Sequence, residues 1–380
     1  MTSVPQTGAH AELIDDLLSD PATDSAVHQF EQRPQGTDTP ALPERSAVTF
    51  LLARFTTPLF DRSLILRVNA LVLEGLNVSL VVLEGTPSDC PPDLLTHPYF
   101  MNWRQVLDQP PPTDLMIATD WTTCYLAVRL GIRYPALVVG SFVREFEADS
   151  PEARRRGLQE RVSRTYSWPC LRFAESEAVC QAVRAVGGSI TRIVPPLEAD
   201  RFYPRDPSPA DRHQPPVLLV NLENCAGDPS AISIAAEACR RLKVAQPDVH
   251  IRVIGDNLVA GVRDWIDDPL GHPHDLNSGN ALRTATVLLD TSNARGFNRW
   301  VAEAFASGLA CVLTTSGGTA ELVRDRDNCL LTDPGDIDGL CTALRQLLND
   351  KGLNQALGKS ARHTLQALTP ADHSLGWSWH

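Results

Sequence analysis

Short apolar runs alternate with amphipathic segments along most of this chain, and no other feature constrains its fold as strongly. Apolar runs at residues 47–53, 78–85 and 136–142 predict buried strands, and the segment 61–76 predicts an amphipathic helix between the first two. The same succession begins again with an apolar run at residues 217–223. Repeated strand–helix–strand units predict an α/β protein built on parallel, doubly wound sheets.

The length of the chain predicts two domains. A single hydrophobic core rarely exceeds about 250 residues, and this chain has 380. The proline-rich, polar stretch at residues 201–216 predicts the linker between them. We therefore expect two Rossmann-like domains facing across a cleft, at residues 46–205 and 206–365. Residues 1–45, rich in Pro, Thr, Asp and Gln, predict a mobile lead-in with one short helix within residues 11–20. The aromatic tail at residues 366–380 is expected to pack on the N-terminal domain.

Charge and cysteine content exclude several classes of protein. The net charge of −12 argues against general nucleic-acid binding, which leaves a basic footprint. The chain shows no signal peptide and no apolar stretch near the roughly 20 residues that span a bilayer, so we predict a cytoplasmic protein with at most peripheral membrane contact. Nine dispersed cysteines without a CxxC pair predict reduced core thiols and no metal site: Cys90, Cys124, Cys170, Cys180, Cys225, Cys239, Cys311, Cys329 and Cys341.

The segment at residues 293–322 contains the most specific functional pattern. A loop with Gly296 leads into a helix, a turn and a buried strand follow, and Gly317 and Gly318 are expected to open a second helix. Two loops that feed helix N-termini offer backbone N–H groups and a positive helix end to an anion. Glu303 lies inside the first of these helices. The layout suits a sugar nucleotide, with phosphates at the helix ends and ribose hydroxyls on the carboxylate.

This pattern resembles the large group of retaining GT-B glycosyltransferases that includes glycogen and sucrose synthases. That group carries the motif E-G-F-G-x-P-x-x-E-A, and residues 295–304 read R-G-F-N-R-W-V-A-E-A. In the first half, the loop FVREFEADS at residues 142–150 is similar to the F-V-Q-D-Y-E loop of bacterial rhamnosyltransferases of cell-surface glycan assembly. The resemblance extends over residues 47–362 and implies two Rossmann-like domains of the GT-B type.

Two departures from the group concern the diphosphate of the donor. Arg295 stands where the group has a glutamate, which reverses the charge. The group has a basic pair after the first strand of the second domain, but residues 221–232 contain no Lys or Arg here. Glu223 and Asp228, in that stretch, would repel phosphate if they faced the pocket.

The resemblance implies a donor site in the second domain. Glu303 would accept the ribose hydroxyls. The resemblance gives no role to Arg295, but Arg295 and Arg299 could supply the missing positive charge as catalytic cations, because a guanidinium group holds a diphosphate through bidentate hydrogen bonds. The alternative makes Glu303 a solvated helix residue and the arginines surface residues of a loop. The alternative for Ser316 and Thr319 is that their hydroxyls only cap the second helix. The other expected donor-binding residues are Gly296, Phe297, Ser316, Gly317, Gly318 and Thr319.

An acceptor site is expected in the first domain. Arg144 and Glu145 lie in the loop after one predicted strand, together with Glu147, and Asp120 and Trp121 follow another. Ligands of parallel sheets bind outside the carboxyl ends of the strands, so these residues are candidates for recognising the acceptor or the sugar. The alternative is an ordinary charged loop.

The sequence therefore predicts a retaining glycosyltransferase of polysaccharide biosynthesis. It would move a sugar, such as rhamnose or another deoxyhexose, from a nucleotide-diphosphate donor to a glycan or lipid-linked acceptor, with no cofactor. Catalysis would be mainly positional, because cations and helix ends stabilise the leaving diphosphate. Retention of the anomeric configuration is implied by the resemblance alone.

The missing basic pair leaves a second interpretation open. Each charge-assisted contact contributes about 1.5–3 kcal/mol, so losing several would abolish useful donor binding. The chain would then be a catalytically weak or inactive GT-B-fold protein that binds a glycan or a partner. A sugar-nucleotide epimerase is a third possibility, in which the likeness of the acceptor loop is accidental.

Overall fold

The computed structural model describes residues 14–33, 46–55, 58–198, 200–204, 214–225, 228–255, 264–271, 276–292, 296–314 and 320–368. The chain divides into two units between Pro196 and Leu197. Each unit contains one parallel sheet, so the predicted pair of doubly wound α/β domains is confirmed. None of the described helices combines the length and apolar character needed to span a membrane.

The first unit is built on a seven-stranded sheet in the order β3-β2-β1-β4-β5-β6-β7. Its elements up to the middle of the sheet are α2 (Pro21–Glu31), β1 (Ala47–Leu52), α3 (Pro58–Leu73), β2 (Asn77–Val82), β3 (Tyr99–Phe100), α4 (Trp103–Asp108) and β4 (Leu115–Ala118). The remainder are α5 (Trp121–Arg133), β5 (Val138–Phe142), α6 (Pro151–Arg156), α7 (Gln159–Thr165), β6 (Leu171–Ala174), α8 (Glu177–Ala185) and β7 (Thr191–Arg192).

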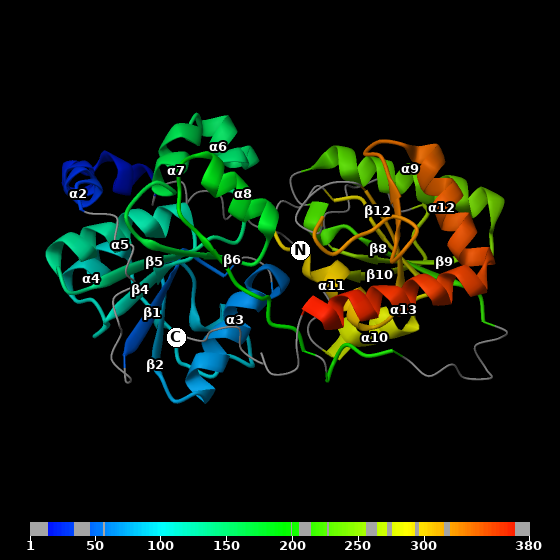
Figure 1. Cartoon of the computed structure of the whole chain (residues 1–380), viewed down its shortest axis with the longest axis horizontal. Helices are drawn as coiled ribbons and strands as arrows, with labels where there is room; N and C mark the ends of the chain where they lie inside the picture. The colour runs from blue at the N-terminus through cyan, green and yellow to red at the C-terminus, as the bar shows by residue number, and fades with distance from the viewer. Residues whose placement is uncertain are drawn as a thin grey trace. The chain divides into compact units, whose positions relative to one another are not determined.

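Apolar strands between two helical layers explain the stability of this sheet. Strand β1 is buried along its length after Ala47, as expected for a parallel strand covered on both faces. Phe50 and Leu52 belong to the core under α3, whereas Leu51 belongs to the core under α5 and its neighbours. Figure 1 shows α3 on one side of the sheet and α5 on the other. Alternate side chains of β1 therefore pack against helices on the two opposite faces of the sheet.

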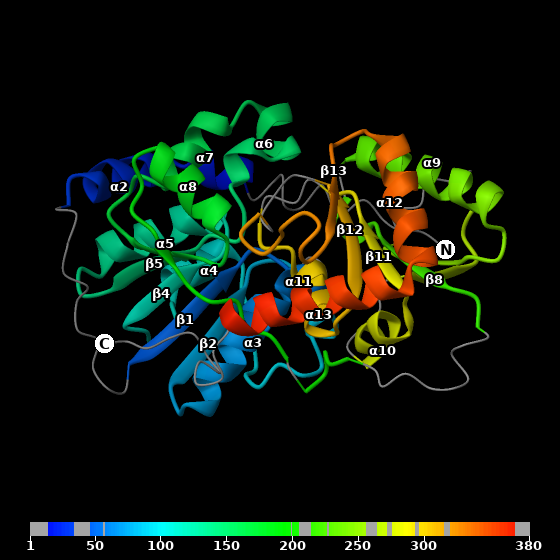
Figure 2. The ribbon, with the colours of Figure 1, turned by 45° about the vertical axis from the view of Figure 1, so that its right-hand side comes forward.

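The second unit is built on a six-stranded sheet in the order β10-β9-β8-β11-β12-β13. Figure 2 shows α9 and α12 on one face of this sheet and α10, α11 and α13 on the other. In chain order its elements are β8 (Val217–Asn221), α9 (Pro229–Ala245), β9 (His250–Ile254), β10 (Asp268–Gly271), α10 (Leu276–Thr284), β11 (Val287–Asp290), α11 (Arg299–Ala306), β12 (Ala310–Thr314), β13 (Leu330–Thr332), α12 (Ile337–Asn349) and α13 (Lys351–Leu368).

The boundary between the units lies earlier than the sequence predicted. Residues 197–204, assigned above to the first domain, belong to the second unit. The Arg283 guanidinium donates to the backbone oxygen of Arg201 at 2.7 Å and lies over the Tyr203 ring, 4.8 Å from its centroid. These contacts attach the segment to α10. The central part of the predicted linker, residues 205–213, lies outside the described residues, as does most of the tail at 366–380.

The short helix predicted within residues 11–20 is present at residues 14–19. A second helix, α2, follows at Pro21–Glu31, where the sequence predicted a mobile lead-in. Helix α2 buries one face that includes Val27 and Phe30, and both contribute to the core of the first unit. Glu31 also accepts a hydrogen bond from the Trp168 indole at 2.9 Å. Composition suggested mobility, but apolar side chains at helical spacing give α2 a face that packs on α5.

We expect Phe30→Ala to destabilise the first unit by about 3–5 kcal/mol, because it removes a buried aromatic ring and leaves a cavity. Phe30 is 1% exposed, whereas His28 on the same helix is exposed. Chemical denaturation of the Phe30→Ala and His28→Ala variants measures both effects. Equal stability of the two variants would show that α2 does not hold the first unit together.

Candidate functional site

The carboxyl ends of β8 and β11 define the switch point of the second sheet. These strands pair in parallel, with Asn221 opposite Asp290 at their last residues. On either side of this pair the strand order runs outward in opposite directions. Open α/β sheets bind ligands at such a point, outside the carboxyl ends of the strands.

A buried carboxylate organises this edge. Asp290, 2% exposed, accepts hydrogen bonds from the side-chain amides of Asn221 at 2.7 Å and Asn298 at 3.0 Å. It also accepts one from the backbone N–H of Ser292 at 2.8 Å. The carboxylate thus links the end of β8, the loop after β11 and the residue that caps α11. A buried charge with this many donors is stabilised against its desolvation.

Helix α11 begins beside this network and carries a buried ion pair. Asn298 caps the helix, its side-chain oxygen accepting from the Val301 N–H at 3.3 Å. One turn apart on α11, Arg299 Nε lies 2.7 Å from Glu303 Oε1. Arg299 is 4% exposed and Glu303 1%, so the interpretation of both as solvated surface residues is wrong. A second carboxylate, Glu198 Oε2, lies 3.9 Å from Arg299 Nη2.

The two acidic residues after β8 are held by other parts of the fold. The Glu223 carboxylate accepts a hydrogen bond from the Trp300 indole at 2.9 Å. Asp228 caps α9 and accepts from the N–H groups of Ser230 and Ala231 at 3.1 Å each. Pro229, the first residue of α9, has no N–H to offer. The N-terminus of α9 is therefore occupied by the protein's own carboxylate.

Only part of the predicted donor loops falls within the described residues. Gly296 and Phe297 are half-buried and lead directly into α11. Arg295 and residues 316–319 lie outside the described residues. The second helix predicted after the glycine pair is absent from the residues described there, because residues 320–328 form turns and loop before β13. The glycine pair thus precedes a turn, for which glycine is equally suited.

In the first unit, the four predicted acceptor residues meet around one pocket. The pocket has a volume of about 340 Å³ and lies after the carboxyl ends of β1 and β4, which form the switch point of that sheet. Asp120, Trp121, Arg144 and Glu145 all line it. Its other lining residues are Ala53, Arg54, Thr119, Glu147, Ser150, Pro151, Glu152 and Arg155.

Two carboxyl groups of this pocket contact the N-terminus of α5. Asp120 caps the helix, accepting from the Thr123 N–H at 2.9 Å, and Glu147 accepts from the Trp121 N–H at 2.9 Å. Loss of solvation, followed by the charges of Asp120 and Glu145, raises the pKa of Glu147 well above its usual value. A protonated glutamate would be a hydrogen-bond donor in a pocket otherwise rich in acceptors and guanidinium groups.

The sequence analysis missed several residues of the second switch point. It assigned no role to Asn221, Asp290, Asn298 or Glu198. A signal for the first two exists, since each is the polar last residue of a short apolar strand, and parallel strands end at the same edge. Nothing local in the sequence indicates that Glu198 lies beside Arg299.

Comparisons with known proteins connect this geometry to a family. Residues 224–350 match the family described as glycosyl transferases group 1. This third of the chain is therefore similar to the group 1 glycosyltransferases. It is 26% identical over 280 residues to glycogen synthase of Mycobacterium tuberculosis, covering 66% of this chain and 64% of that one. It is 30% identical over 89 residues to N-acetyl-alpha-D-glucosaminyl L-malate synthase of Bacillus anthracis, which is 23% of each chain.

A solved structure extends the likeness to the whole fold. HepE from Anabaena, in complex with UDP and glucose, superposes with a TM-score of 0.69 at 17% identity, covering 85% of this chain and 95% of that one. The predicted fold class, two Rossmann-like sheets of the GT-B type, is therefore confirmed. The chain spans about a quarter of the length of the first curated relative that it matches, 23%.

We expect Asp290→Ala to destabilise the second unit by about 3 kcal/mol or more, since it leaves three buried donors without their acceptor. The Asp290→Asn variant keeps one acceptor oxygen, so its free energy of unfolding should lie between those of Asp290→Ala and the wild type. Urea denaturation monitored through the buried Trp300 and Trp265 measures the effect. A loss below about 1 kcal/mol for Asp290→Ala would contradict an organising role, because surface substitutions fall in that range.

Glu147→Gln is expected to stabilise the protein at neutral and alkaline pH. The folded protein holds a proton on Glu147 at pH values where the unfolded chain has lost it, so the free energy of unfolding falls as pH rises from about 4.5 through the raised pKa. The Glu147→Gln variant has no carboxyl group at this position and does not lose stability in this way. Its gain in the free energy of unfolding over the wild type should disappear as pH falls toward 4.5. Denaturation series at several pH values measure the difference.

Glu152→Gln is the matched control for this experiment. It removes a carboxylate from the same pocket without touching the N-terminus of α5. We expect its stability to follow that of the wild type across the pH series. A Glu147→Gln variant that gains no stability between pH 5 and pH 8 would contradict the raised pKa.

Proposed function

We propose that this chain is a retaining glycosyltransferase that uses a nucleotide-diphosphate sugar. The second unit would bind the donor at its switch point, and the pocket of the first unit would bind the acceptor. The observation that carries the proposal is the buried Arg299–Glu303 pair at the start of α11, beside the switch point and inside the segment that matches the group 1 family. A buried carboxylate there is suited to two adjacent ribose hydroxyls, which it would accept together.

The contacts of Arg299 support a role different from the one proposed for Arg295. Arg299 lies between the carboxylates of Glu303 and Glu198, so much of its charge is already compensated. We therefore assign Arg299 as a positioning residue that holds Glu303 in place. The diphosphate would be held by Arg295 and by backbone N–H groups near Gly296 and Phe297, at the positive end of α11.

The reaction would exchange one bond to the anomeric carbon for another. The bond from that carbon to the diphosphate oxygen breaks, and the acceptor oxygen bonds to the same face while its proton passes to the departing phosphate. Positioning and stabilisation of the leaving diphosphate would supply most of the rate. The acceptor-loop likeness supports rhamnose or another deoxyhexose as the sugar, and a surface glycan or its lipid-linked precursor as the acceptor.

A second candidate is supported by the residues after β8. Asp228 fills the N-terminus of α9, Glu223 is tied to Trp300, and this stretch contributes no cation. A donor site lacking those contacts would bind a diphosphate weakly. The chain would then be a GT-B-fold protein that binds a glycan or a partner without transferring sugar.

We expect one nucleotide among UDP, GDP and dTDP, or its sugar conjugate, to raise the melting temperature of the full chain. A ligand at 100 times its Kd stabilises the native state by about 2.7 kcal/mol. The shift should disappear in an Arg299→Met, Glu303→Leu double variant, which replaces the buried pair by apolar groups of similar volume and so keeps the core packed. Differential scanning fluorimetry measures each shift against the unliganded variant.

The outcomes separate the two candidates. No shift with any nucleotide at millimolar concentration would overturn the donor site. A shift that persists in the double variant would place the nucleotide elsewhere. A shift lost in the double variant, but without release of nucleoside diphosphate from any sugar conjugate in the presence of glycan acceptors, would support the binding protein.

A further inference from the structure

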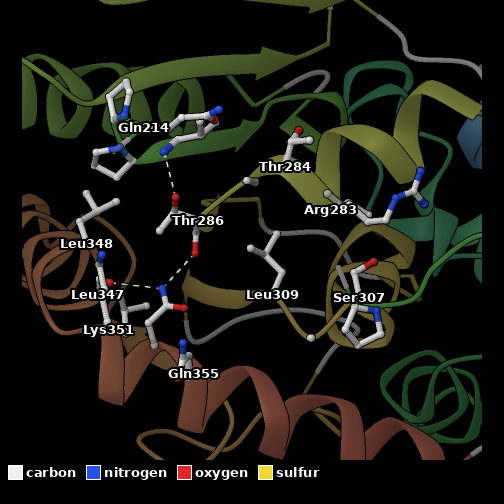
Figure 3. A pocket seen from close by; sticks show the side chains of 18 residues that line it. Gln214, Arg283, Thr284, Thr286, Ser307, Leu309, Leu347, Leu348, Lys351 and Gln355 are labelled. Carbon is white, nitrogen blue, oxygen red and sulfur yellow. Dashed lines mark hydrogen bonds between the residues drawn. The ribbon is translucent and has the colours of Figure 1, made fainter. Parts of the chain in front are cut away.

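A second pocket in the second unit lies at the opposite edge of the sheet from Asp290. It has a volume of about 460 Å³ and borders the first residue of β8, Val217, and the residues just before β11 and β12, Thr286 and Leu309 (Figure 3). We call it the amino-edge pocket. A strand of five residues such as β8 spans about 15 Å. A ligand here would therefore not touch the switch point.

Helix ends form the walls of the amino-edge pocket. The last turns of α10 and α12 contribute Arg283 and Leu347, and Ser307 follows the last residue of α11. Helix α13 begins at the pocket and supplies its first residue, Lys351, and Gln355 one turn later. Helices that return along a parallel sheet must end at its amino edge, so carbonyl-rich helix C-termini gather there.

The charges around the pocket nearly cancel. Among the described lining residues, Arg283 and Lys351 are cations and none carries a carboxylate. Each of the three helix C-termini contributes roughly −0.5 of an elementary charge, which opposes the two cations, and the N-terminus of α13 contributes roughly +0.5. Asp350, just outside the pocket, caps α13 by accepting from the Leu353 N–H at 2.9 Å and adds a further negative charge. Neither a strongly anionic nor a cationic ligand is favoured by such a field.

The hydrogen-bonding groups of the pocket are mixed in the same way. Lys351 and the exposed side-chain amide of Gln355 lie one turn apart on α13, and Gln214 lines the opposite wall. Ser307 is 7% exposed, and its hydroxyl has no hydrogen-bond partner within the part of the chain that the structure describes. The apolar lining consists mainly of prolines and leucines, together with Val217 and Ala285: the prolines and leucines are Pro204, Pro215, Pro216, Leu282, Leu309, Leu347 and Leu348.

We propose that the amino-edge pocket binds a neutral saccharide, as a site separate from both switch points. Sugar hydroxyls are donors and acceptors at once, so they can donate to helix-end carbonyls and accept from amide and ammonium groups. The C–H faces of a sugar ring would lie on the prolines and leucines. The volume falls within the range of about 300–1,000 Å³ that is usual for small-molecule sites. This site does not depend on the proposed transferase activity.

Saturation-transfer NMR on the full chain tests the proposal with maltotriose, cellotriose and methyl α-rhamnoside as probes. We expect transfer to the protons of at least one saccharide, unchanged by saturating nucleotide. In a Lys351→Ala, Gln355→Ala double variant the affinity for that saccharide should fall about tenfold. Both side chains are exposed, so this variant should fold normally.

A matched control lies further along the same helix. Lys359 and Gln366 are exposed on α13 and do not line the pocket. The Lys359→Ala, Gln366→Ala variant should bind the saccharide within about twofold of the wild type. No transfer to any of the three probes, equal loss of binding in both double variants, or displacement of the saccharide by inorganic phosphate would each overturn the proposal.

Discussion

The carboxylate of Asp290 is the contact on which the second unit's functional edge depends. Strand pairing alone fixes the positions of β8 and β11, but it does not determine where the chain goes after they end. The hydrogen bonds from Asn221, Ser292 and Asn298 to this one carboxylate hold together the end of β8, the residues just after β11 and the residue that caps α11. The positions of Arg299 and Glu303 follow, since both are fixed by where that helix begins.

The first unit uses a related arrangement at its own switch point. Asp120 follows β4 and caps α5, and its carboxylate also accepts from the Ala53 N–H after β1 at 3.3 Å. In both units, then, one acidic residue joins the ends of two central strands to a helix start. The difference lies in exposure. Asp290 is 2% exposed and serves the fold, whereas Asp120 borders an open pocket that a ligand can enter.

The features that depend on the spacing of apolar residues along the chain were predicted correctly. Contacts between segments that are distant in the sequence were not. The alternating apolar runs were sufficient to predict both sheets. Because parallel strands end at the same edge, the sequence was also sufficient to predict that Arg144 and Glu145 lie near Asp120. The docking of α2 depends on its packing against α5, a contact between distant segments that no local pattern shows. The second helix after Gly317 was wrong because a glycine pair suits a turn as well as a helix start.

The burial of Glu303, which excludes the alternative of a solvated helix residue, depends on the charges around it. Arg201, Glu198, Arg299 and Glu303 alternate in sign, at 2.8, 3.9 and 2.7 Å between successive members. A lone buried carboxylate would be strongly disfavoured by desolvation, and a lone guanidinium equally so. Because Glu198 and Arg201, at the start of the second unit, lie in line with Arg299, the charge of the Arg299–Glu303 pair is balanced by neighbours of alternating sign. The segment at 197–204 is therefore part of the candidate donor site rather than a passive connection.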